Sequence, residues 1–505
     1  MSKSVLVSFN GYPQTPSAFV PDNGLASLAS CLLKRGHDTR IFDYNIPETI
    51  KWLYSDSKEG FGQALKSYAR KIADEILSVQ DLDFIGFKLW TGDGFKASTQ
   101  IATEVKKRNP NLKLIAGGPH VDLFREKIFQ NTNAFDVVAF GEGEETITGY
   151  AENIDGLRKL EDVPNVIYRS NGTIRQNDEK RIQHMDDLPF PVYDKEVYPT
   201  INMKLRMLVS EWARGCPYRC NFCTHPSKSG SVVRSKTATR IVDEFAYDKP
   251  FTSVFLSGDS DTPGKLLEEV AEELISRRQK IVYTAITHMN HVNKERLMKM
   301  KEAGFTGIFY GMESGSQELL DKSIDKKLKV ATIRKAISDA KDTGLTVFTS
   351  VIIPAPGETE ASKLATLDML LELKPDYVPV NVPMIGPFSK WHDEPESYGI
   401  ELSSDYDDRL MFFTPTLLFP PSEWNPLRYK IDGKEFSQIA QESNNFVEQL
   451  EKARIATQIS CDIFLMAKYA EIEPREFRNK ARKILASGDY KEMEQIIQKI
   501  NRNIT

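Results

Sequence analysis

Arg214-Gly215-Cys216-Pro217-Tyr218-Arg219-Cys220-Asn221-Phe222-Cys223-Thr224 is the stretch that decides the fold of this chain. It contains three of the five cysteines, at C-x3-C-x2-C spacing, directly after the apolar run 207–212. Cysteine thiolates at short spacings are the usual ligands of iron–sulfur clusters. Three ligands, where four would saturate a 4Fe-4S cluster, leave one iron open. The stretch therefore predicts an iron–sulfur cluster that can bind a substrate or cofactor at its open iron.

Two other uses of clustered cysteines compete with this prediction. A structural zinc site usually has four closed ligands, commonly in two separated pairs. Cys31 and Cys461 are isolated, so they form no second pair, although His225 lies close enough to serve as a fourth ligand. A disulfide is less favoured, because the length of the chain and the lack of a signal peptide favour a reducing compartment.

The cysteine loop resembles that of the radical S-adenosylmethionine (SAM) superfamily, with Phe222 before the last cysteine and a strand/helix repeat following it. The resemblance implies that Cys216, Cys220 and Cys223 hold a 4Fe-4S cluster and that Phe222 lies beside SAM. It also implies that the amino and carboxylate groups of SAM chelate the open iron. An electron, from a donor such as flavodoxin or ferredoxin, then cleaves SAM to a 5′-deoxyadenosyl radical.

The composition is that of an ordinary globular protein. Its 505 residues predict about two to four domains, and 40% hydrophobic with 27% charged residues is a typical content. A net charge of −5 gives no electrostatic case for a nucleic-acid partner. No apolar run approaches the ~18 residues of a membrane span, and we find no secretory pattern. We therefore expect a cytoplasmic protein without nucleic-acid or membrane partners.

Residues 1–155 are predicted to form a doubly wound, Rossmann-like parallel sheet. Apolar, β-rich runs alternate there with helical segments, as they do in α/β domains. The runs cover residues 4–9, 39–42, 84–89, 112–116 and 137–140. Ligands of such sheets bind at the carboxyl ends of the strands, near the point where the strand order reverses.

Three consecutive strand ends in this domain carry glycine. They are Thr91-Gly92, Gly117-Gly118-Pro119-His120 and Gly141-Glu142-Gly143-Glu144. Glycine lets the backbone approach a phosphate or a flat ring closely. Glycines can also serve only to terminate strands. The presence of glycine at three consecutive strand ends nevertheless favours a ligand-binding site.

With the cysteine loop downstream, this region resembles the cobalamin-binding domain of radical SAM enzymes. The resemblance implies that cobalamin and its nucleotide tail are lined by Thr91, Gly117, Gly118, Glu142 and Gly143. The chain has no D-x-H-x-x-G sequence, so the resemblance is to the branch in which no histidine replaces the lower cobalt ligand. His120 is expected to make a local hydrogen bond.

Residues 156–200 are predicted to be a hairpin and a linker. The run 166–176 alternates around Asn171-Gly172, a strong hairpin signal. Leu188-Pro189-Phe190-Pro191 then favours extended backbone.

Residues 201–390 are predicted to form a six-stranded partial (β/α) barrel, since six βα units are too few for a closed eight-stranded barrel. The strands are expected at 207–212, 253–258, 281–287, 307–313, 346–353 and 377–382. Residues at the carboxyl ends of these strands should carry the chemistry.

Two of these strand ends match the superfamily. Gly258 and Asp259 lie where it has a glycine-rich turn and an acidic residue for the SAM ammonium. Gly311-Met312-Glu313-Ser314-Gly315-Ser316 matches its G-x-E-S-G-S, which implies that Glu313 and Ser314 contact the ribose or methionine end of SAM. Asp259 and Ser314 are equally suited to capping helices. His288 and His291 are expected to line the same mouth, and no catalytic residue is assigned.

Residues 391–505 are predicted to be a mainly helical region that either covers the substrate or only closes the open barrel as a lid. Its first part, through about residue 435, is rich in proline and aromatic residues, and helical periodicity begins near residue 434. Cys461 is expected to be a buried apolar residue rather than a ligand.

The function these features favour is that of a cobalamin-dependent radical SAM enzyme. We expect it to methylate an unactivated carbon of a natural product or peptide, using a deoxyadenosyl radical and methylcobalamin. A rearrangement, cyclisation or epimerisation is an alternative, as is a non-enzymatic cobalamin- or redox-sensing module. A methylthiotransferase is disfavoured, because Cys31 alone cannot hold a second cluster.

Overall fold

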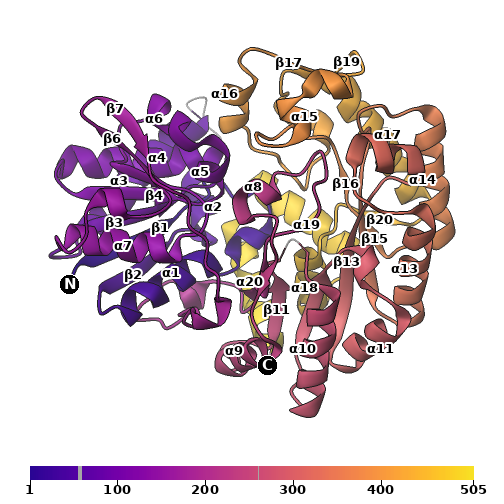
Figure 1. Ribbon diagram of the computed structural model, residues 1–505, viewed down its shortest axis with the longest axis horizontal. Helices are drawn as coiled ribbons and strands as arrows, with labels where there is room; N and C mark the ends of the chain where they lie inside the picture. The colour runs from indigo at the N-terminus through magenta and orange to yellow at the C-terminus, as the bar shows by residue number, and fades with distance from the viewer. Residues whose placement is uncertain (55–59, 260, 505) are drawn as a thin grey trace. The chain divides into compact units, whose positions relative to one another are not determined.

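A computed structural model describes residues 1–54, 60–259 and 261–504 (Figure 1). The chain forms two compact units. The first comprises Met1–Leu205 with two later segments, Leu410–Thr414 and Lys483–Ile497. The second comprises Arg206–Arg409, Pro415–Arg482 and Gln498–Thr505.

The first unit is built on a seven-stranded sheet of order β2-β1-β3-β4-β5-β6-β7. Its first five strands are parallel, with Val5 of β1 opposite Arg40 of β2 and Ile85 of β3. Val5, Leu6 and Val7 are buried because helices cover both faces of the sheet. The five strands are β1 (Lys3–Ser8), β2 (Asp38–Asp43), β3 (Phe84–Lys88), β4 (Lys113–Gly117) and β5 (Val137–Ala139). The predicted Rossmann-like sheet is confirmed.

The helices of this unit follow the strands in the predicted alternation. Figure 1 shows α1 and α7 on one face of the sheet and α3 and α4 on the other. The Asp22 carboxylate caps α1 by accepting the backbone N–H of Leu25 at 3.0 Å. The helices are α1 (Asn23–Lys34), α2 (Glu48–Leu53), α3 (Gly60–Leu77), α4 (Asp93–Arg108), α5 (Pro119–Phe124), α6 (Ile128–Asn131) and α7 (Glu144–Ile154).

The predicted hairpin is confirmed, and it extends the sheet. Strands β6 (Val166–Ser170) and β7 (Thr173–Gln176) pair antiparallel around Asn171 and Gly172, whose φ angles are 49° and 79°. These values are typical of the two-residue hairpin turns that match strand twist. β6 also pairs antiparallel with β5.

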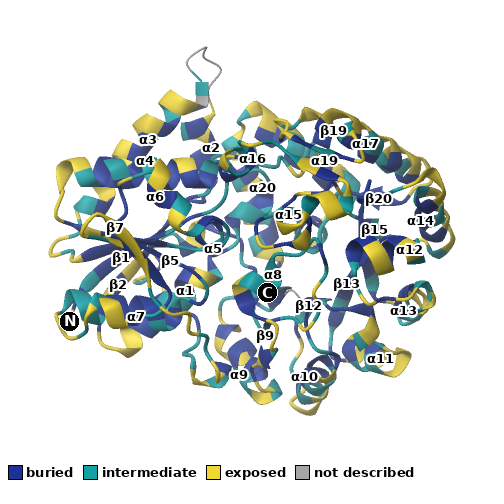
Figure 2. Cartoon of the chain, turned by 45° about the horizontal axis from the view of Figure 1, so that its top comes forward, coloured by how far each residue is buried: buried dark blue, intermediate teal, exposed yellow. Residues whose placement is uncertain are grey.

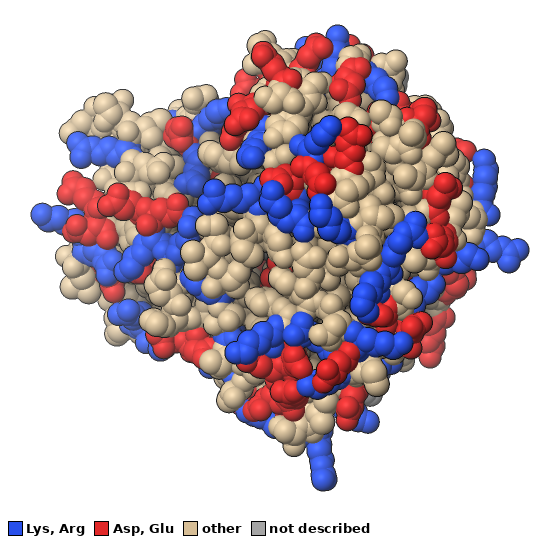
Figure 3. All heavy atoms as spheres, turned by 45° about the vertical axis from the view of Figure 1, so that its right-hand side comes forward, with Lys and Arg blue, Asp and Glu red and all other residues tan. Residues whose placement is uncertain are grey.

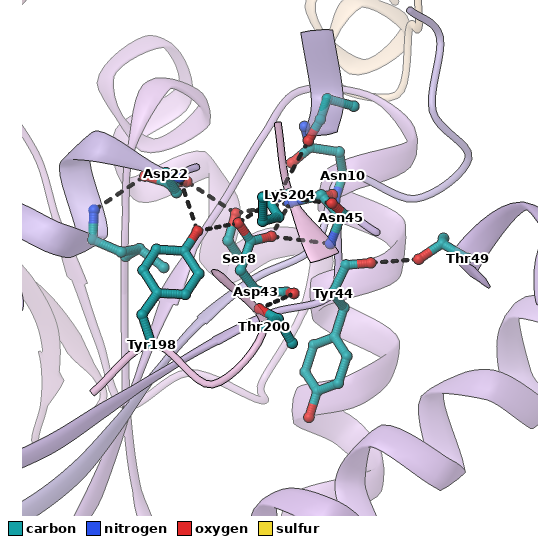
Figure 4. A network of polar contacts seen from close by, with 12 residues as sticks. Ser8, Asn10, Asp22, Asp43, Tyr44, Asn45, Thr49, Tyr198, Thr200 and Lys204 are labelled. Carbon is teal, nitrogen blue, oxygen red and sulfur yellow. Dashed lines mark hydrogen bonds and ion pairs between the residues drawn. The ribbon is translucent and has the colours of Figure 1, made fainter. Parts of the chain in front are cut away.

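The chain after the hairpin returns to the carboxyl ends of β1 and β2, where it joins a buried polar network (Figure 4). Lys204 Nζ lies 2.6 Å from Asp43 Oδ2 and donates to Asn45 O at 2.7 Å. The Tyr198 hydroxyl donates to Asp43 and accepts the backbone N–H of Asp22. Residues through Leu205 belong to the first unit, which thus includes the end of the predicted linker and the first residues of the segment predicted as barrel.

The second unit contains an open parallel sheet of order β20-β15-β14-β13-β12-β11-β8, with β16 also pairing β14. Within the described residues no pairing joins β8 to β20, so the barrel is partial, as predicted. The strands are β8 (Leu208–Ser210), β11 (Val254–Ser257), β12 (Val282–Ile286), β13 (Phe305–Glu313), β14 (Thr346–Ile352), β15 (Tyr377–Val378), β16 (Val380–Asn381) and β20 (Ala456–Thr457). The sequence did not predict β20, which has two residues.

Helices cover the outer side of this sheet, and Figure 2 shows their outward faces exposed and their inward faces buried. The sequence pattern explains this for α10, where Leu266, Leu267, Val270 and Leu274 are all buried. The helices of this layer are α9 (Ala238–Asp248), α10 (Gly264–Ser276), α11 (Lys294–Glu302), α12 (Gln317–Leu319), α13 (Val330–Asp342) and α14 (Glu360–Leu373).

The C-terminal region is mainly helical, as predicted, but it begins with a small antiparallel sheet. Strands β17 (Ile400–Leu402), β18 (Tyr429–Ile431) and β19 (Lys434–Glu435) pair in that order. The helices are α15 (Lys390–Asp393), α16 (Tyr406–Met411), α17 (Phe436–Lys452), α18 (Cys461–Ala470), α19 (Pro474–Ser487) and α20 (Tyr490–Asn503). Cys461 is the first residue of α18, and burial raises the pKa of its thiol.

Segment 410–414 of this region belongs to the first unit, where it lies against the end of β3. Gly92 N–H donates to Met411 O at 3.3 Å, and Asp93 N–H donates to Thr414 Oγ1 at 2.8 Å. The rings of Phe95 and Phe412 lie 5.5 Å apart. Thr414 thus supplies a hydrogen bond to the first turn of α4 from far along the chain.

The surface carries both signs of charge in close mixture. On the face shown in Figure 3, acidic and basic side chains lie beside one another. Among the described residues, no helix combines the length and apolar character of a membrane span.

Candidate active site

The cysteine loop follows the first strand of the open sheet. β8 leads through β9 (Ala213–Arg214), which pairs antiparallel with β10 (Arg234–Ser235), to the cysteines and then to α8 (His225–Ser229). Cys216 N–H donates to Gly230 O at 3.1 Å. Cys223 N–H donates to Cys220 O at 3.0 Å, and His225 N–H donates to Cys223 Sγ at 3.4 Å. The loop is therefore folded back on itself by its own backbone.

The three thiols are partly buried. Burial raises the pKa of Cys216 to about 11 and that of Cys220 to about 12, and it also raises the pKa of Cys223. In the described residues no three His, Cys, Asp or Glu side chains are already arranged to hold a metal ion. Thiols lose their protons when they bind metal, so assembly of a cluster on this loop would release protons.

Packing behind the loop holds it in place. Asn221 N–H donates to Ile324 O at 2.8 Å, and Asn221 Nδ2 donates to Ser323 O at 3.0 Å. Trp391 donates from its backbone N–H to Asn221 O and from its indole to Ser323 O. The ring of Phe222 lies 5.7 Å from that of Trp391. Phe222 therefore packs at the base of the loop, where the loop meets the C-terminal region.

Asp259, the predicted ligand of the SAM ammonium, is buried and makes three hydrogen bonds. Its Oδ1 accepts the backbone N–H groups of Trp212 and Ala213 at 2.7 and 3.0 Å. Its Oδ2 accepts the Thr262 hydroxyl at 2.8 Å. Burial raises the pKa of Asp259 to about 7. The carboxylate thus joins the ends of β8 and β11, and Gly258 N–H adds a bond to Ser210 O between the same strands.

Asp261 connects the cysteine loop to the two histidines that follow β12. Its carboxylate accepts His288 N–H at 2.8 Å and lies 3.3 Å from His291 Nδ1 and 4.0 Å from Cys216 Sγ. The ring of Tyr218, inside the loop, stacks on that of His288 with centroids 4.0 Å apart. Both histidines therefore lie beside the cysteine loop.

The G-x-E-S-G-S segment lies at the end of β13. A register shift against β14 occurs between Gly311 and Glu313, and Glu313 has a φ angle of 65°. Ser314 Oγ accepts Ser316 N–H at 3.1 Å and lies 3.4 Å from Thr366 Oγ1. Glu313 and Ser314 are both buried.

Lys326 also belongs to this site, although no sequence motif predicts it. Its ammonium lies 2.7 Å from Glu313 Oε1, and its side chain is 11% exposed. It follows the π-helical turn η7 (Leu320–Ile324), which the cysteine loop contacts through Asn221. The position of this lysine depends on that turn, and a lone lysine after a helix carries no sequence signal.

The residues predicted to line cobalamin lie along one edge of the first sheet, at the carboxyl ends of β3, β4 and β5. Thr91 follows β3, and its carbonyl accepts Gly94 N–H at 3.3 Å. Gly117 ends β4, and Gly118 has a φ angle of 97°. Glu142 Oε2 accepts Ile182 N–H at 2.7 Å, and Gly143 immediately precedes α7. The structure thus brings these residues to one edge, with the carboxylate of Glu142 turned toward residue 182.

Lys88 and Trp90 lie at the same edge and were not predicted. Lys88 Nζ lies 2.8 Å from Asp22 Oδ1 and 4.4 Å from the centroid of the Trp90 ring. Interactions with Lys88 hold the pKa of Asp22 below its usual value against the effect of burial. β3 ends at Lys88 beside β1, where the strand order reverses.

His120 does not make the local hydrogen bond that the sequence predicts for its ring. Among the described residues neither ring nitrogen has a partner, and the side chain is fully buried. Its ring stacks on Phe95 at 4.2 Å and lies 4.7 Å from Phe124. Burial lowers its pKa to about 3, so the imidazole is neutral.

Comparison with known proteins finds a family match in each of the two units. Residues 210–370 match the radical SAM superfamily, and residues 14–151 match the B12-binding domain. The chain is a radical SAM enzyme with a B12-binding domain. This radical SAM enzyme is 27% identical over 365 residues to an uncharacterized methyltransferase of Pyrococcus horikoshii, covering 71% of this chain and 74% of the relative.

Two further proteins extend the comparison. The anaerobic magnesium-protoporphyrin IX monomethyl ester cyclase of Rubrivivax gelatinosus is 26% identical over 312 residues, or 58% of this chain; the match spans about half of that relative, 55%. A structure of the radical SAM methyltransferase TsrM from Kitasatospora setae, with cobalamin and a [4Fe-4S] cluster bound, aligns with 97% of this chain and 100% of its own. The TM-score is 0.70 and the identity 13%, which shows a shared fold.

These domains imply a 4Fe-4S cluster, SAM and cobalamin as the cofactors of the enzyme. The donor set fits the cluster, because three thiols in one folded loop are the ligands that iron–sulfur clusters use. The first sheet fits a large flat cofactor, because glycines stand at three adjacent strand ends beside the point of strand-order reversal.

Proposed function

We propose that this protein is a cobalamin-dependent radical SAM methyltransferase that methylates an unactivated carbon of a small molecule or peptide. The observation that carries this proposal is the combination, in one chain, of a C-x3-C-x2-C loop at the end of the first barrel strand and a B12-binding sheet. Each cofactor supplies difficult chemistry, and the protein orients it.

In this proposal the residues divide into three groups. Cys216, Cys220 and Cys223 hold the cluster, and a protein electron donor such as flavodoxin or ferredoxin reduces it. Phe222, Gly258, Asp259, Glu313 and Ser314 form the SAM site. Thr91, Gly117, Gly118, Glu142 and Gly143 line the cobalamin. The hydrogen bonds that Asp259 already makes with Trp212, Ala213 and Thr262 give it a positioning role beside any contact with SAM.

A cyclisation is the second candidate, and the similarity to a magnesium-protoporphyrin ester cyclase favours it. The two candidates differ in what happens to the methyl group of SAM. A methyltransferase passes that group to cobalamin and releases S-adenosylhomocysteine, whereas a radical cyclase consumes SAM only as a source of the deoxyadenosyl radical.

A substrate-independent experiment separates these candidates. The purified enzyme, reconstituted anaerobically with iron, sulfide and hydroxocobalamin, is reduced and mixed with SAM that carries a deuterated methyl group. The methyltransferase proposal predicts deuterated methylcobalamin bound to the protein and an equal amount of S-adenosylhomocysteine. Deoxyadenosine without either product would contradict methyl transfer and support the cyclase.

A further inference from the structure

The turn that carries Lys326 is fixed to the cysteine loop on one side and to the end of β12 on the other. Asn221, between the second and third cysteines, donates to the carbonyls of Ser323 and Ile324. His288 Nε2 lies 3.2 Å from Lys326 O, and Asn290 Nδ2 donates to Lys327 O at 3.0 Å. The position of Lys326 relative to the cysteines is therefore set by hydrogen bonds.

Glu313 and the space above Gly311 determine where the ammonium of Lys326 lies. The ammonium and the Glu313 carboxylate form an ion pair of 2.7 Å, with side chains 11% and 7% exposed. A Cβ atom at position 311 would overlap both Glu313 Oε1 and Lys326 Nζ. The glycine of G-x-E-S-G-S thus leaves the space that this pair occupies.

The cysteine loop is also linked to the turn of Lys326 through Tyr218. The ring of Tyr218, between the first two cysteines, stacks on that of His288 with centroids 4.0 Å apart, and His288 Nε2 lies 3.2 Å from Lys326 O. The carboxylate of Asp261 accepts the backbone N–H of His288 and lies 4.0 Å from Cys216 Sγ. Lys326 is thus a largely buried cation next to the cysteine loop, and its turn is linked to that loop on both sides of the second cysteine.

We propose that Lys326 is the internal counter-cation of the iron–sulfur cluster and that Glu313 holds and partly offsets its charge. The proposal rests on the proposed function, which places a cluster on the three cysteines. Reduction adds one electron to the cluster from an external reductant, with no bond formed or broken and no proton taken up. A buried cation stabilises the more negative, reduced cluster, because little water screens the interaction. Lys326 therefore raises the reduction potential, and Glu313 lowers it.

The two charges make predictions of opposite sign. In the reconstituted protein without SAM, the Lys326→Met substitution should lower the equilibrium constant for cluster reduction about tenfold, which is ~59 mV for a one-electron couple. The Glu313→Gln substitution should raise it. Lys326→Arg keeps the charge and should stay close to the unsubstituted protein. Lys327→Met is the matched control, since the neighbouring Lys327 is 69% exposed and pairs with Asp325.

The measurement is a redox titration with dithionite, followed by the electron paramagnetic resonance signal of the reduced cluster, after iron and sulfide contents are matched. Equal potentials for Lys326→Met and Lys327→Met, or shifts of the same sign for Lys326→Met and Glu313→Gln, would overturn the proposal. If the Lys326→Met variant fails to hold a cluster, the Glu313→Gln variant alone provides the test. A reduction potential in that variant that is not raised would contradict the proposal. Failure of the unsubstituted protein to hold a cluster would instead refute the proposed function.

Discussion

The ammonium of Lys204 lies 2.6 Å from the carboxylate of Asp43, and the two side chains are 0% and 1% exposed. Lys204 stands just before the start of the second unit, at Arg206, while Asp43 ends β2 at the edge where the first sheet is expected to bind cobalamin. The pair therefore fixes the chain that leads to the cysteine loop onto the B12-binding sheet.

Removal of Lys204 should destabilise the first unit strongly. Lys204→Met leaves the Asp43 carboxylate buried without its cation, which costs about 3–5 kcal/mol. Lys3→Met is the control, because Lys3 of β1 pairs with Asp38 of β2 in the same sheet, but with side chains 33% and 61% exposed. An exposed pair contributes about 0–1 kcal/mol. Thermal unfolding checks this prediction, and equal effects of the two substitutions would contradict it.

Asp259 offers a test that separates a positioning role from a SAM contact. Asp259→Ala removes the acceptor of two buried backbone N–H groups and should cost about 2–4 kcal/mol of stability. Asp259→Asn keeps a carbonyl oxygen that can accept both N–H groups, so it should retain most of the stability that Asp259→Ala loses. Thermal unfolding and SAM affinity are measured together. A loss of SAM affinity in Asp259→Asn at unchanged stability would show instead that the charge contacts SAM.

His120 should make the first unit sensitive to acid. Its pKa is about 3 in the folded protein and 6.5 as a free side chain, so the unfolded chain binds one more proton between these pH values. Stability therefore falls as the pH drops from 6.5 toward 3, by about 1.4 kcal/mol per pH unit.

The control for this prediction is His120→Phe, which keeps an aromatic ring between Phe95 and Phe124. Between pH 6 and pH 5, the free energy of unfolding should decrease less in this variant than in the unsubstituted protein. The difference between the two decreases should be about 1.4 kcal/mol. Chemical unfolding at the two pH values measures the difference. Parallel pH profiles would rule out a neutral, buried His120.

The packing of segment 410–414 against Gly92 can be tested by comparing Gly92→Ala with Gly172→Ala. Both have positive φ, at 63° and 79°, a backbone conformation that alanine rarely adopts. Only at Gly92 would the added Cβ overlap Phe413 O and Thr414 Oγ1, whereas nothing lies within 4 Å at Gly172. Gly92→Ala should therefore also release the segment, making it cleavable by a protease under native conditions. Equal cleavage of the two variants would contradict this assignment.

The sequence predicted those parts of the fold that have long apolar strands. β1 and β14 are buried along nearly their whole length and are recognisable by their β-branched and other apolar residues. β20 has two residues and no such signal, so its place at the sheet edge could not be read from the sequence. The three cysteines were recognisable because their spacing is local. Lys326 was not, because its role depends on residues 313 and 216–223, which only the tertiary fold brings near.

Hydrogen-bond partners were the least predictable part of the site. Asp259 and Glu142 were predicted as ligand contacts, yet their carboxylates accept backbone N–H groups of Trp212 and Ala213, and of Ile182. A buried carboxylate near an unpaired N–H forms such a bond whenever the fold permits it. Sequence patterns contain no information about which distant N–H that is.

The central claim is that the three cysteines hold a cluster that cleaves SAM in a protein that also binds cobalamin. The most direct test is anaerobic reconstitution with iron, sulfide and hydroxocobalamin, followed by reduction with SAM and quantification of 5′-deoxyadenosine and bound cobalamin. We predict deoxyadenosine and stoichiometric cobalamin in the unsubstituted protein, and cobalamin without deoxyadenosine in Cys220→Ala. Deoxyadenosine formed equally by Cys220→Ala, or formed by neither protein, would contradict the claim.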